Sequence, residues 1–466
     1  MKQIIIRYAL PAIALCFAGA GCNPKLYAPE VDVPESYIYA IGKERDSLQL
    51  SEQWWQMFGD TTLNRLIERA LSANRNLAAA VSRIEEARDN LRVVRAEFLP
   101  SVDVGVSAGA TDSEPTSIQQ SYKITPTISW EVPLFGSLRH TSNAAHAEIA
   151  YAEWQYRGVR LLLAAEVATT YFTLLQYKRD YDIAVRSSQL RRESASLIDS
   201  IFRRGMATGL NLERAKNLVY TAEADIPVYD RAIRQTLLSL DVLLGEMPDS
   251  TNYATTGLRL ITDYKPLEIP AGLPSDILHR RPDVMSAYWQ MEQAAANVGI
   301  ARSARFPSIS LTAAGGASSI KIGELFNNDS WYWSVLGSLA QPLFRFGSLK
   351  RSEMAARERY RQAVLAYEQT YIEAVSDVES ALVSIAAYRE ETARYRQLVQ
   401  SNTRVAIMTS ALYNNGLSAY LDVIDAERTL YDSQMQFSNI VAQQYINYVN
   451  LCKALGGGWV EIPTNR

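Results

Sequence analysis

The chain has 466 residues, 48% of them hydrophobic and 21% charged, and its formal net charge is −3. This composition is that of a folded protein and excludes a largely disordered chain. The near-neutral charge also excludes the basic surface that a nucleic-acid-binding protein needs. Three cysteines, at positions 16, 22 and 452, cannot complete a disulfide framework, and their spacing fits no zinc site. We expect Cys452 to be a buried core thiol.

Residues 1–21 have the pattern of a secretory signal peptide, in which basic residues precede an apolar run and small residues follow it. The segment before Cys22 resembles a bacterial lipobox with a glycine where leucine is usual. We predict an acylated Cys22 at the start of a lipidated arm over residues 22–60. An ordinary signal peptide with an incidental cysteine is the alternative. By resemblance to enterobacterial lipoproteins, the lack of an aspartate after Cys22 favours the outer membrane.

The rest of the chain contains an internal duplication. Four pairs of anchors recur in the same order: Pro100 and Pro307, Pro133 and Pro342, Gly205 and Gly416, and Leu244 and Leu455. Their offsets of 207, 209, 211 and 211 residues are too regular to arise by chance. We predict two structural repeats, over residues 61–270 and 271–466. Each repeat is expected to contain a long helix, a β-hairpin and further helices.

Each repeat opens with the heptad spacing of a coiled coil. In the first repeat the a positions are Leu63, Ala70, Leu77, Ile84, Leu91 and Phe98, and the d positions are Leu66, Ala73, Ala80, Ala87 and Val94. In the second repeat they are Ile277, Val284, Met291 and Val298, with Ala287, Ala294 and Ala301. This period predicts a long helix in a left-handed supercoil. The alanines allow neighbouring helices to approach closely.

A period of two follows, which predicts β-hairpins at about 101–133 and 308–343. We expect the polar residues 112–120 to link the first pair of strands. Strands of about ten residues with one apolar face are typical of a membrane barrel wall, although a soluble sheet packed on helices has the same pattern. Trp331 and Trp333 would belong to an interfacial girdle in the first case and to a core in the second. No later stretch holds about 18 apolar residues, so we expect no transmembrane helix.

Longer helical segments come next, from about 139 to 204 and from about 350 to 413. Helices of this length span roughly 90–100 Å, more than a compact core needs. Four strands cannot close a barrel, because the smallest membrane barrels have about eight, and open strand edges are not tolerated in lipid. The chain is therefore expected to oligomerise, and three copies would supply twelve strands.

Four segments together resemble the TolC family of outer-membrane efflux channels, in its lipoprotein branch serving resistance-nodulation-division pumps. They are the proline-spaced arm at 27–34, WWQMFGD at 54–60, LPSDILHRRPDV at 273–284 and ALGGGW at 454–459. The resemblance implies a mainly α chain with a membrane β-barrel. It implies a homotrimer with a 12-stranded barrel and a long periplasmic helical barrel. The implied partners are a periplasmic adaptor and an inner-membrane pump of that class, which supplies the energy.

The resemblance also assigns functional residues. Gly205 and Gly416 suit left-handed turns between antiparallel helices, and the family places adaptor docking and closure at these tips. Asp422 and Asp425 lie three residues apart on one helix face, and family aspartates at these positions ring the lumen. Two solvated surface acids are the alternative. Tyr413 matches a tyrosine that locks the closed tip. The family's gating arginine would fall at Ser418, so the details of the gate differ here.

The sequence contains no constellation for catalysis. It has no H-E-x-x-H, no G-x-S-x-G and no phosphate-binding glycine loop, and its three histidines are not spaced as metal ligands. We therefore predict no enzyme activity, no cofactor and no metal site. The RRPD segment at 280–283 is interpreted as structural, with Pro282 as the first residue of a helix. The alternative functions are a duct for type I protein secretion and a lipid-anchored scaffold without a pore.

Overall fold

The computed structural model describes residues 26, 37–39, 51–113, 116–248, 261 and 280–458. The predicted signal peptide, Cys22, the proline-spaced arm apart from a few residues, residues 273–279 and Trp459 lie outside them. The described chain divides into two compact units. The sheet unit comprises Val81–Trp154 and Met285–Thr370, and the helical unit comprises the described residues of 32–80, 155–284 and 371–466.

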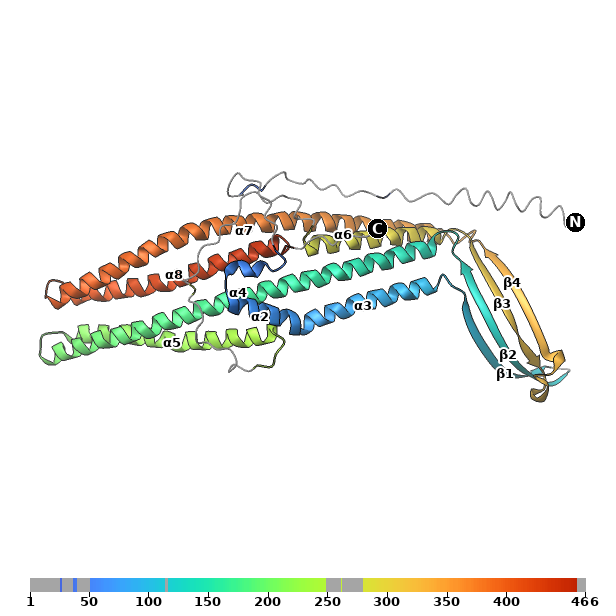
Figure 1. The fold of residues 1–466 in the computed structure, drawn as a ribbon, viewed down its shortest axis with the longest axis horizontal. Helices are drawn as coiled ribbons and strands as arrows, with labels where there is room; N and C mark the ends of the chain where they lie inside the picture. The colour runs from blue at the N-terminus through green and yellow to red at the C-terminus, as the bar shows by residue number, and fades with distance from the viewer. Residues whose placement is uncertain are drawn as a thin grey trace. The chain divides into compact units, whose positions relative to one another are not determined.

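The sheet unit contains four antiparallel strands in the order β1-β2-β3-β4, side by side in Figure 1. Their bounds are Ser101–Ser113, Thr116–Val132, Ser308–Ser319 and Trp331–Ala340. The two predicted hairpins are thus joined edge to edge by the pairing of β2 with β3. The expected linker at 112–120 is wrong, because β1 runs to Ser113 and β2 starts at Thr116. The strand pairing extends into these polar residues: Thr111 pairs with Gln119 and, after a shift in register, Ser113 pairs with Thr116.

One face of this sheet is apolar and exposed in the single chain. Its side chains recur at every second position of the strands, as a pleated sheet requires. They include Val102, Val104, Val106, Ile128, Leu311, Trp333, Val335 and Leu339, which are 42–82% exposed. Trp331 and Trp333 are 63% and 82% exposed, so they form no core cluster with the described residues of this chain. This face therefore needs a partner other than the described part of its own chain.

The long helices repeat with the same lengths in both halves. Helices α4 (Ser137–Arg203) and α7 (Ser348–Asn414) have 67 residues each, and α5 (Gly209–Leu243) and α8 (Tyr420–Ala454) have 35 each. In Figure 1, α4 turns back into α5 and α7 into α8. The predicted bounds of the long helices were right to within two residues. Each 67-residue helix spans about 100 Å.

One expectation about hydropathy was wrong. Among the described residues, α4 contains an 18-residue window apolar enough to cross a membrane by length and composition. In the structure 56% of that window is buried inside the chain. The core helix of a soluble protein can have the same composition, so by itself the window is only weak evidence for a membrane-spanning helix.

Most of the described heptad residues are buried along the seam that their spacing predicts, and the others, such as Val94 and Phe98, are half-buried. Ile277 lies outside the described residues. The first helix is broken. Helix α2 (Thr61–Ala73) ends at Asn74 and α3 (Arg75–Ala96) begins directly after it. The Asn74 carboxamide accepts hydrogen bonds from the Asn76 and Leu77 amides at 2.9 and 3.2 Å, which caps α3. In the sheet unit, α6 (Pro282–Ser303) packs against α7 through Met291, Val298, Tyr360 and Val364. The helix begins at Pro282, as predicted.

The helical unit has an aromatic core built from the WWQMFGD segment. The short 3-10 helix η1 (Trp54–Phe58) places the Phe58 ring 5.1 Å from that of Phe172, which lies 5.5 Å from Tyr445. Asp60 caps α2, and Tyr171 donates a 2.7 Å hydrogen bond to its carboxylate. Cys452 is 2% exposed and lies against Met57, so the predicted core thiol is confirmed. Burial raises the pKa of this thiol to about 12, which makes it unreactive.

Candidate functional site

The two helix tips have the same backbone geometry. Gly205 and Gly416 have φ angles of 75° and 74°, the left-handed conformation that the sequence predicts for them. After each helix, the glycine amide bonds the carbonyl three residues back, and the next amide bonds the carbonyl five residues back. These are paired Schellman hydrogen bonds, which end a helix sharply. No described residue lies within 4 Å of the place where a Cβ atom would stand, so the requirement for glycine comes from the φ angle.

Apolar side chains are exposed around both tips. Met206, Leu210 and Leu417 are 68%, 59% and 73% exposed, and Phe202 and Leu421 are 40% and 44% exposed. Below them, Ile198, Leu212, Leu218, Val423 and Ile424 form a buried cluster. Tyr413 packs on this cluster, and its ring centroid lies 5.2 Å from that of Tyr420. The tips therefore combine a rigid interior with an apolar exterior, which suits a docking surface.

The two candidate aspartates are exposed, and each has its own partner. The Asp422 carboxylate accepts a 3.1 Å hydrogen bond from the Ala419 amide, which caps the N-terminus of α8. Asp425 lies 3.4 Å from Arg428 and is 57% exposed. At the equivalent tip of the first repeat, Thr208 supplies the cap instead. Within one chain these are solvated acids on one helix face, and the lumenal ring stays a prediction.

A buried polar layer lies deeper in the helical unit, and the sequence did not reveal it. Arg191 of α4 is 3% exposed and donates to the carbonyls of Leu218 on α5, at 3.0 Å, and Glu427 on α8, at 3.5 Å. Its guanidinium lies 4.7 Å from the Tyr431 ring, and the Tyr431 hydroxyl donates a 2.6 Å hydrogen bond to Asp225. Burial lowers the pKa of Arg191, but its pKa is so high that it remains charged. This layer joins three helices.

A second buried acid lies on the same helix. Asp180 of α4 is 3% exposed, and burial raises the pKa of its carboxyl to about 6, although the polar groups of Ser438 on α8 and Gln176 favour the charged form. The positive charge of Arg179 offsets the shift only in part. Burial thus places the pKa of this carboxyl between mildly acidic and neutral pH.

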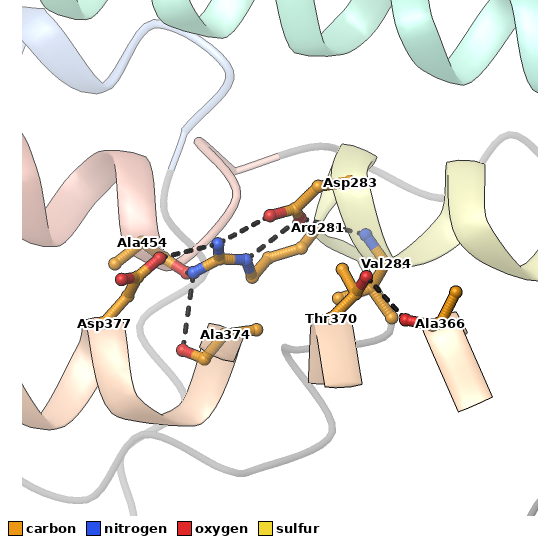
Figure 2. A network of polar contacts seen from close by, with 8 residues as sticks. All are labelled: Arg281, Asp283, Val284, Ala366, Thr370, Ala374, Asp377 and Ala454. Carbon is orange, nitrogen blue, oxygen red and sulfur yellow. Dashed lines mark hydrogen bonds and ion pairs between the residues drawn. The ribbon is translucent and has the colours of Figure 1, made fainter. Parts of the chain in front are cut away.

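The RRPD segment forms a network that fastens the end of α8, as Figure 2 shows. Arg281 donates to both oxygens of Asp283, to Asp377 on α7 at 3.0 Å, and to the carbonyl of Ala454 at 2.9 Å. Gly456, with φ 81°, packs against the backbone of Arg280 and Arg281. The segments RRPD and ALGGG, far apart in sequence, therefore form one structural joint. The structural interpretation of RRPD is confirmed.

The first repeat has the same joint with different chemistry. Asn74 and Arg281 are 207 residues apart, and Leu243 and Ala454 are 211 apart, which are offsets of the duplication. The Asn74 side chain donates a 2.9 Å hydrogen bond to the Leu243 carbonyl, as Arg281 does to that of Ala454. Gly245, with φ 72°, packs against Ala73 and Asn74 as Gly456 does against Arg280 and Arg281. The duplication therefore extends to individual hydrogen bonds.

Comparisons with known proteins agree with this architecture. A family model described as outer membrane efflux protein matches residues 66–246 and 273–457. The chain is 32% identical over 470 residues to SrpC of Pseudomonas putida, a solvent efflux pump outer membrane protein, and the match covers 97% and 98% of the two chains. It is 30% identical to SilC of Salmonella typhimurium, a probable outer membrane lipoprotein, over 98% and 100% of the chains. The open-state MtrE outer membrane channel of Neisseria gonorrhoeae matches with a TM-score of 0.85, at 27% identity and 94% and 98% coverage.

Proposed function

Because this chain belongs to the outer membrane efflux protein family and is an outer-membrane efflux channel protein, we propose that three copies of it form one passive duct. The observation that carries this proposal is the four-stranded sheet with an exposed apolar face and, within the described residues, an unpaired edge on β1 and on β4. The apolar face suits contact with lipid, but the unpaired strand edges are not stable in a membrane for one chain. Three copies would close twelve strands into a barrel, and the long helices would continue it as a periplasmic tube.

The duct is proposed to be the outer part of a tripartite efflux system. Its partners would be a periplasmic adaptor, docked on the exposed apolar tips around Gly205 and Gly416, and an inner-membrane pump of the resistance-nodulation-division class. The pump would provide energy and select small molecules such as drugs, toxic compounds or metal ions. The family relation of the chain to SrpC, whose name refers to solvent efflux, supports this class of cargo. Acylation of Cys22 would add an anchor in the outer membrane.

The throat of the duct is proposed to be acidic. Three copies of Asp422 and Asp425 would bring six carboxylates together near the closed tips, with Tyr413 packed behind them. The exposure of both acids in the single chain supports this arrangement, since a lumenal ring needs carboxylates that no other element covers. Such a ring would attract cations, because the low-dielectric walls strengthen its field.

The experiment is to record single-channel currents in a planar bilayer from the purified full-length protein. We expect discrete cation-selective openings in the wild type and weaker selectivity in the Asp422→Asn/Asp425→Asn double variant. A Tyr413→Ala variant is included because it removes the ring contact with Tyr420 and would loosen a closed tip. If both the wild type and the Tyr413→Ala variant are silent, the scaffold without a pore becomes the better interpretation.

A second assay separates efflux from protein secretion. Deletion of the gene should make cells sensitive to solvents or antibiotics while the proteins in the culture medium stay unchanged. Loss of one secreted protein without any change in sensitivity would instead favour a type I secretion duct.

A further inference from the structure

The second repeat has two extra residues where its last strand is followed by the long helix. The first repeat passes from β2 to α4 through PLFG at 133–136, and the second passes from β4 to α7 through PLFRFG at 342–347. The insert is Arg345-Phe346, and it changes the offset of the duplication from 209 to 211 residues. The glycines that end the two segments have φ angles of 79° and 78°. The insert is therefore added to a turn whose end is the same in both repeats.

The insert is strained, and its aromatic ring is exposed. Phe346 has a φ of 48° and is the one residue other than glycine with a positive φ in the described part of the chain. A bulky side chain is strained in this conformation, and such strain is typical of functional sites. The Phe346 ring is 90% exposed, and Phe344, whose ring centroid lies 4.7 Å away, is 75% exposed. In the first repeat, by contrast, Phe135 stacks on Phe306 at 5.6 Å.

The exposed rings continue the apolar face of the sheet. They follow β4 within a few residues, and Leu343 beside them is 91% exposed. In the proposed duct, on which this inference rests, this end of the sheet lies at the periplasmic edge of the membrane. Aromatic side chains at such an edge are typical of membrane barrels, but this feature by itself does not say which lipid they contact.

The charge of this edge indicates the lipid. The connections between strands and helices, at 95–100, 133–140, 301–307 and 341–351, contain seven basic residues and one acidic residue, Glu97. The basic residues are Arg95, Arg139, Arg302, Arg305, Arg345, Lys350 and Arg351. This edge of the sheet unit would therefore attract anionic headgroups.

The basic residues nearest the rings are free to bind an anion. Arg305 pairs with Glu353, whereas Arg345, Lys350 and Arg351 are exposed and form no ion pair with the described residues. The acids at the ends of the strands do not neutralise them from the lipid side. Asp103 and Glu131 alternate with apolar residues along β1 and β2, so they point to the polar face of the sheet.

We propose that the insert binds an anionic phospholipid of the periplasmic leaflet, with Arg345 on the phosphate and the rings of Phe344 and Phe346 against the acyl chains. A guanidinium matches the two free oxygens of a phosphodiester. Lys350 and Arg351 in the first turn of α7 add positive charge, which favours phosphatidylglycerol over a zwitterionic phospholipid with its own ammonium group. Because the first repeat lacks the insert, each protomer has one such site.

Photocrosslinking identifies what covers Phe346. Full-length protein with Phe346→p-benzoylphenylalanine is reconstituted in equimolar phosphatidylglycerol and phosphatidylcholine with the same acyl chains, irradiated and analysed by mass spectrometry. We expect phospholipid adducts, with several-fold more phosphatidylglycerol than phosphatidylcholine. Adding Arg345→Gln should lower this ratio several-fold. Adding Arg359→Gln, which removes the same charge from an exposed position further along α7, should leave the ratio unchanged.

The other outcomes would overturn the inference in distinct ways. A covalent dimer in place of lipid adducts would show that a second copy of the chain covers the rings. Equal amounts of the two adducts with Arg345 intact would exclude recognition of the anionic headgroup, and no adduct at all would place the ring in water. Single-channel currents show which variants have folded. Silence of both the unmodified protein and the Tyr413→Ala variant would overturn the proposed duct, whereas conducting protein without a preference for phosphatidylglycerol would overturn this inference alone.

Discussion

The joint around Arg281 gives the sharpest stability prediction. Its side chain is 8% exposed, and it donates to the carbonyls of Ala454 at 2.9 Å and Ala374 at 3.4 Å as well as to Asp283 and Asp377. The two carboxylates are 51% and 57% exposed, so water can solvate them when the arginine is removed. The Ala374 carbonyl lies inside α7 and keeps its helical hydrogen bond, whereas the Ala454 carbonyl lies at the end of α8 and loses its donor. An unsatisfied buried acceptor costs about 1–3 kcal/mol, and the whole change Arg281→Met, which also removes charged hydrogen bonds, should cost about 2–4 kcal/mol.

The assay is urea unfolding of the detergent-solubilised protein, combined with amide hydrogen exchange at the C-terminal turn of α8. Arg281→Met should lower the free energy of unfolding and speed exchange near Ala454. The unfolding free energy of Arg281→Lys should lie between those of the wild type and Arg281→Met, because lysine keeps the positive charge but lacks the planar guanidinium with its several donors. Asn74→Ala is the matched control in the first repeat and should cost only about 1–2 kcal/mol, with faster exchange near Leu243. A loss under about 1 kcal/mol for Arg281→Met would refute this account of the joint.

Three further predictions concern the helical unit. The raised pKa of Asp180 stabilises the fold while the carboxyl is protonated; this contribution is complete below pH 3.8 and is lost as pH rises through about 6. The unfolding free energy of the wild type should therefore fall by about 3 kcal/mol over that pH range. The Asp180→Asn variant should show a flatter dependence of unfolding free energy on pH and a higher stability at pH 7. If the pH dependence is the same in Asp180→Asn as in the wild type, Asp180 is not the group responsible. Gly205→Ala and Gly416→Ala should each cost about 1 kcal/mol in thermal unfolding through their positive φ angles, whereas Gly323→Ala, which has an ordinary φ, should not. Tyr431→Phe should remove the hydrogen bond to Asp225 and destabilise the protein by about 1–2 kcal/mol. Tyr420→Phe is the control and should cost less, because the described contacts of the Tyr420 hydroxyl include no such carboxylate.

Much of the architecture could be predicted because it follows local periodicity. Heptad spacing and alternation gave the long helices and both hairpins, and the offset anchors gave the duplication. The break at Asn74 could not be found this way, because the heptad continues through it from Ala70 to Leu77. What breaks the helix is a side chain that caps α3 and also reaches the Leu243 carbonyl, 169 residues away in sequence.

The buried polar layer was missed for a related reason. Arg191, Asp225 and Tyr431 have no common spacing, and each by itself is typical of a solvated helix surface. Their contact exists only because α4, α5 and α8 pack together. The tip glycines were predictable, since the left-handed turn is a local requirement. The partners of Asp422 and Asp425 were only half predictable: one caps its own helix, and the other pairs with Arg428 three residues on.

The duplicated joint shows how the two repeats can share geometry and differ in strength. Equivalent positions hold Asn74 and Arg281, and each donates to the carbonyl that ends the following helix hairpin. The Asn74 side chain donates to this carbonyl through a neutral amide. The Arg281 side chain donates through a charged guanidinium that also binds the carboxylates of Asp283 and of Asp377 on α7. Charge-assisted hydrogen bonds are about twice as strong as neutral ones. The α4–α5 end should therefore open at lower free energy than the α7–α8 end. Hydrogen exchange that is faster near Leu243 than near Ala454 in the wild type would be the direct sign of this asymmetry, and equal exchange at both ends would show that the two joints are equivalent.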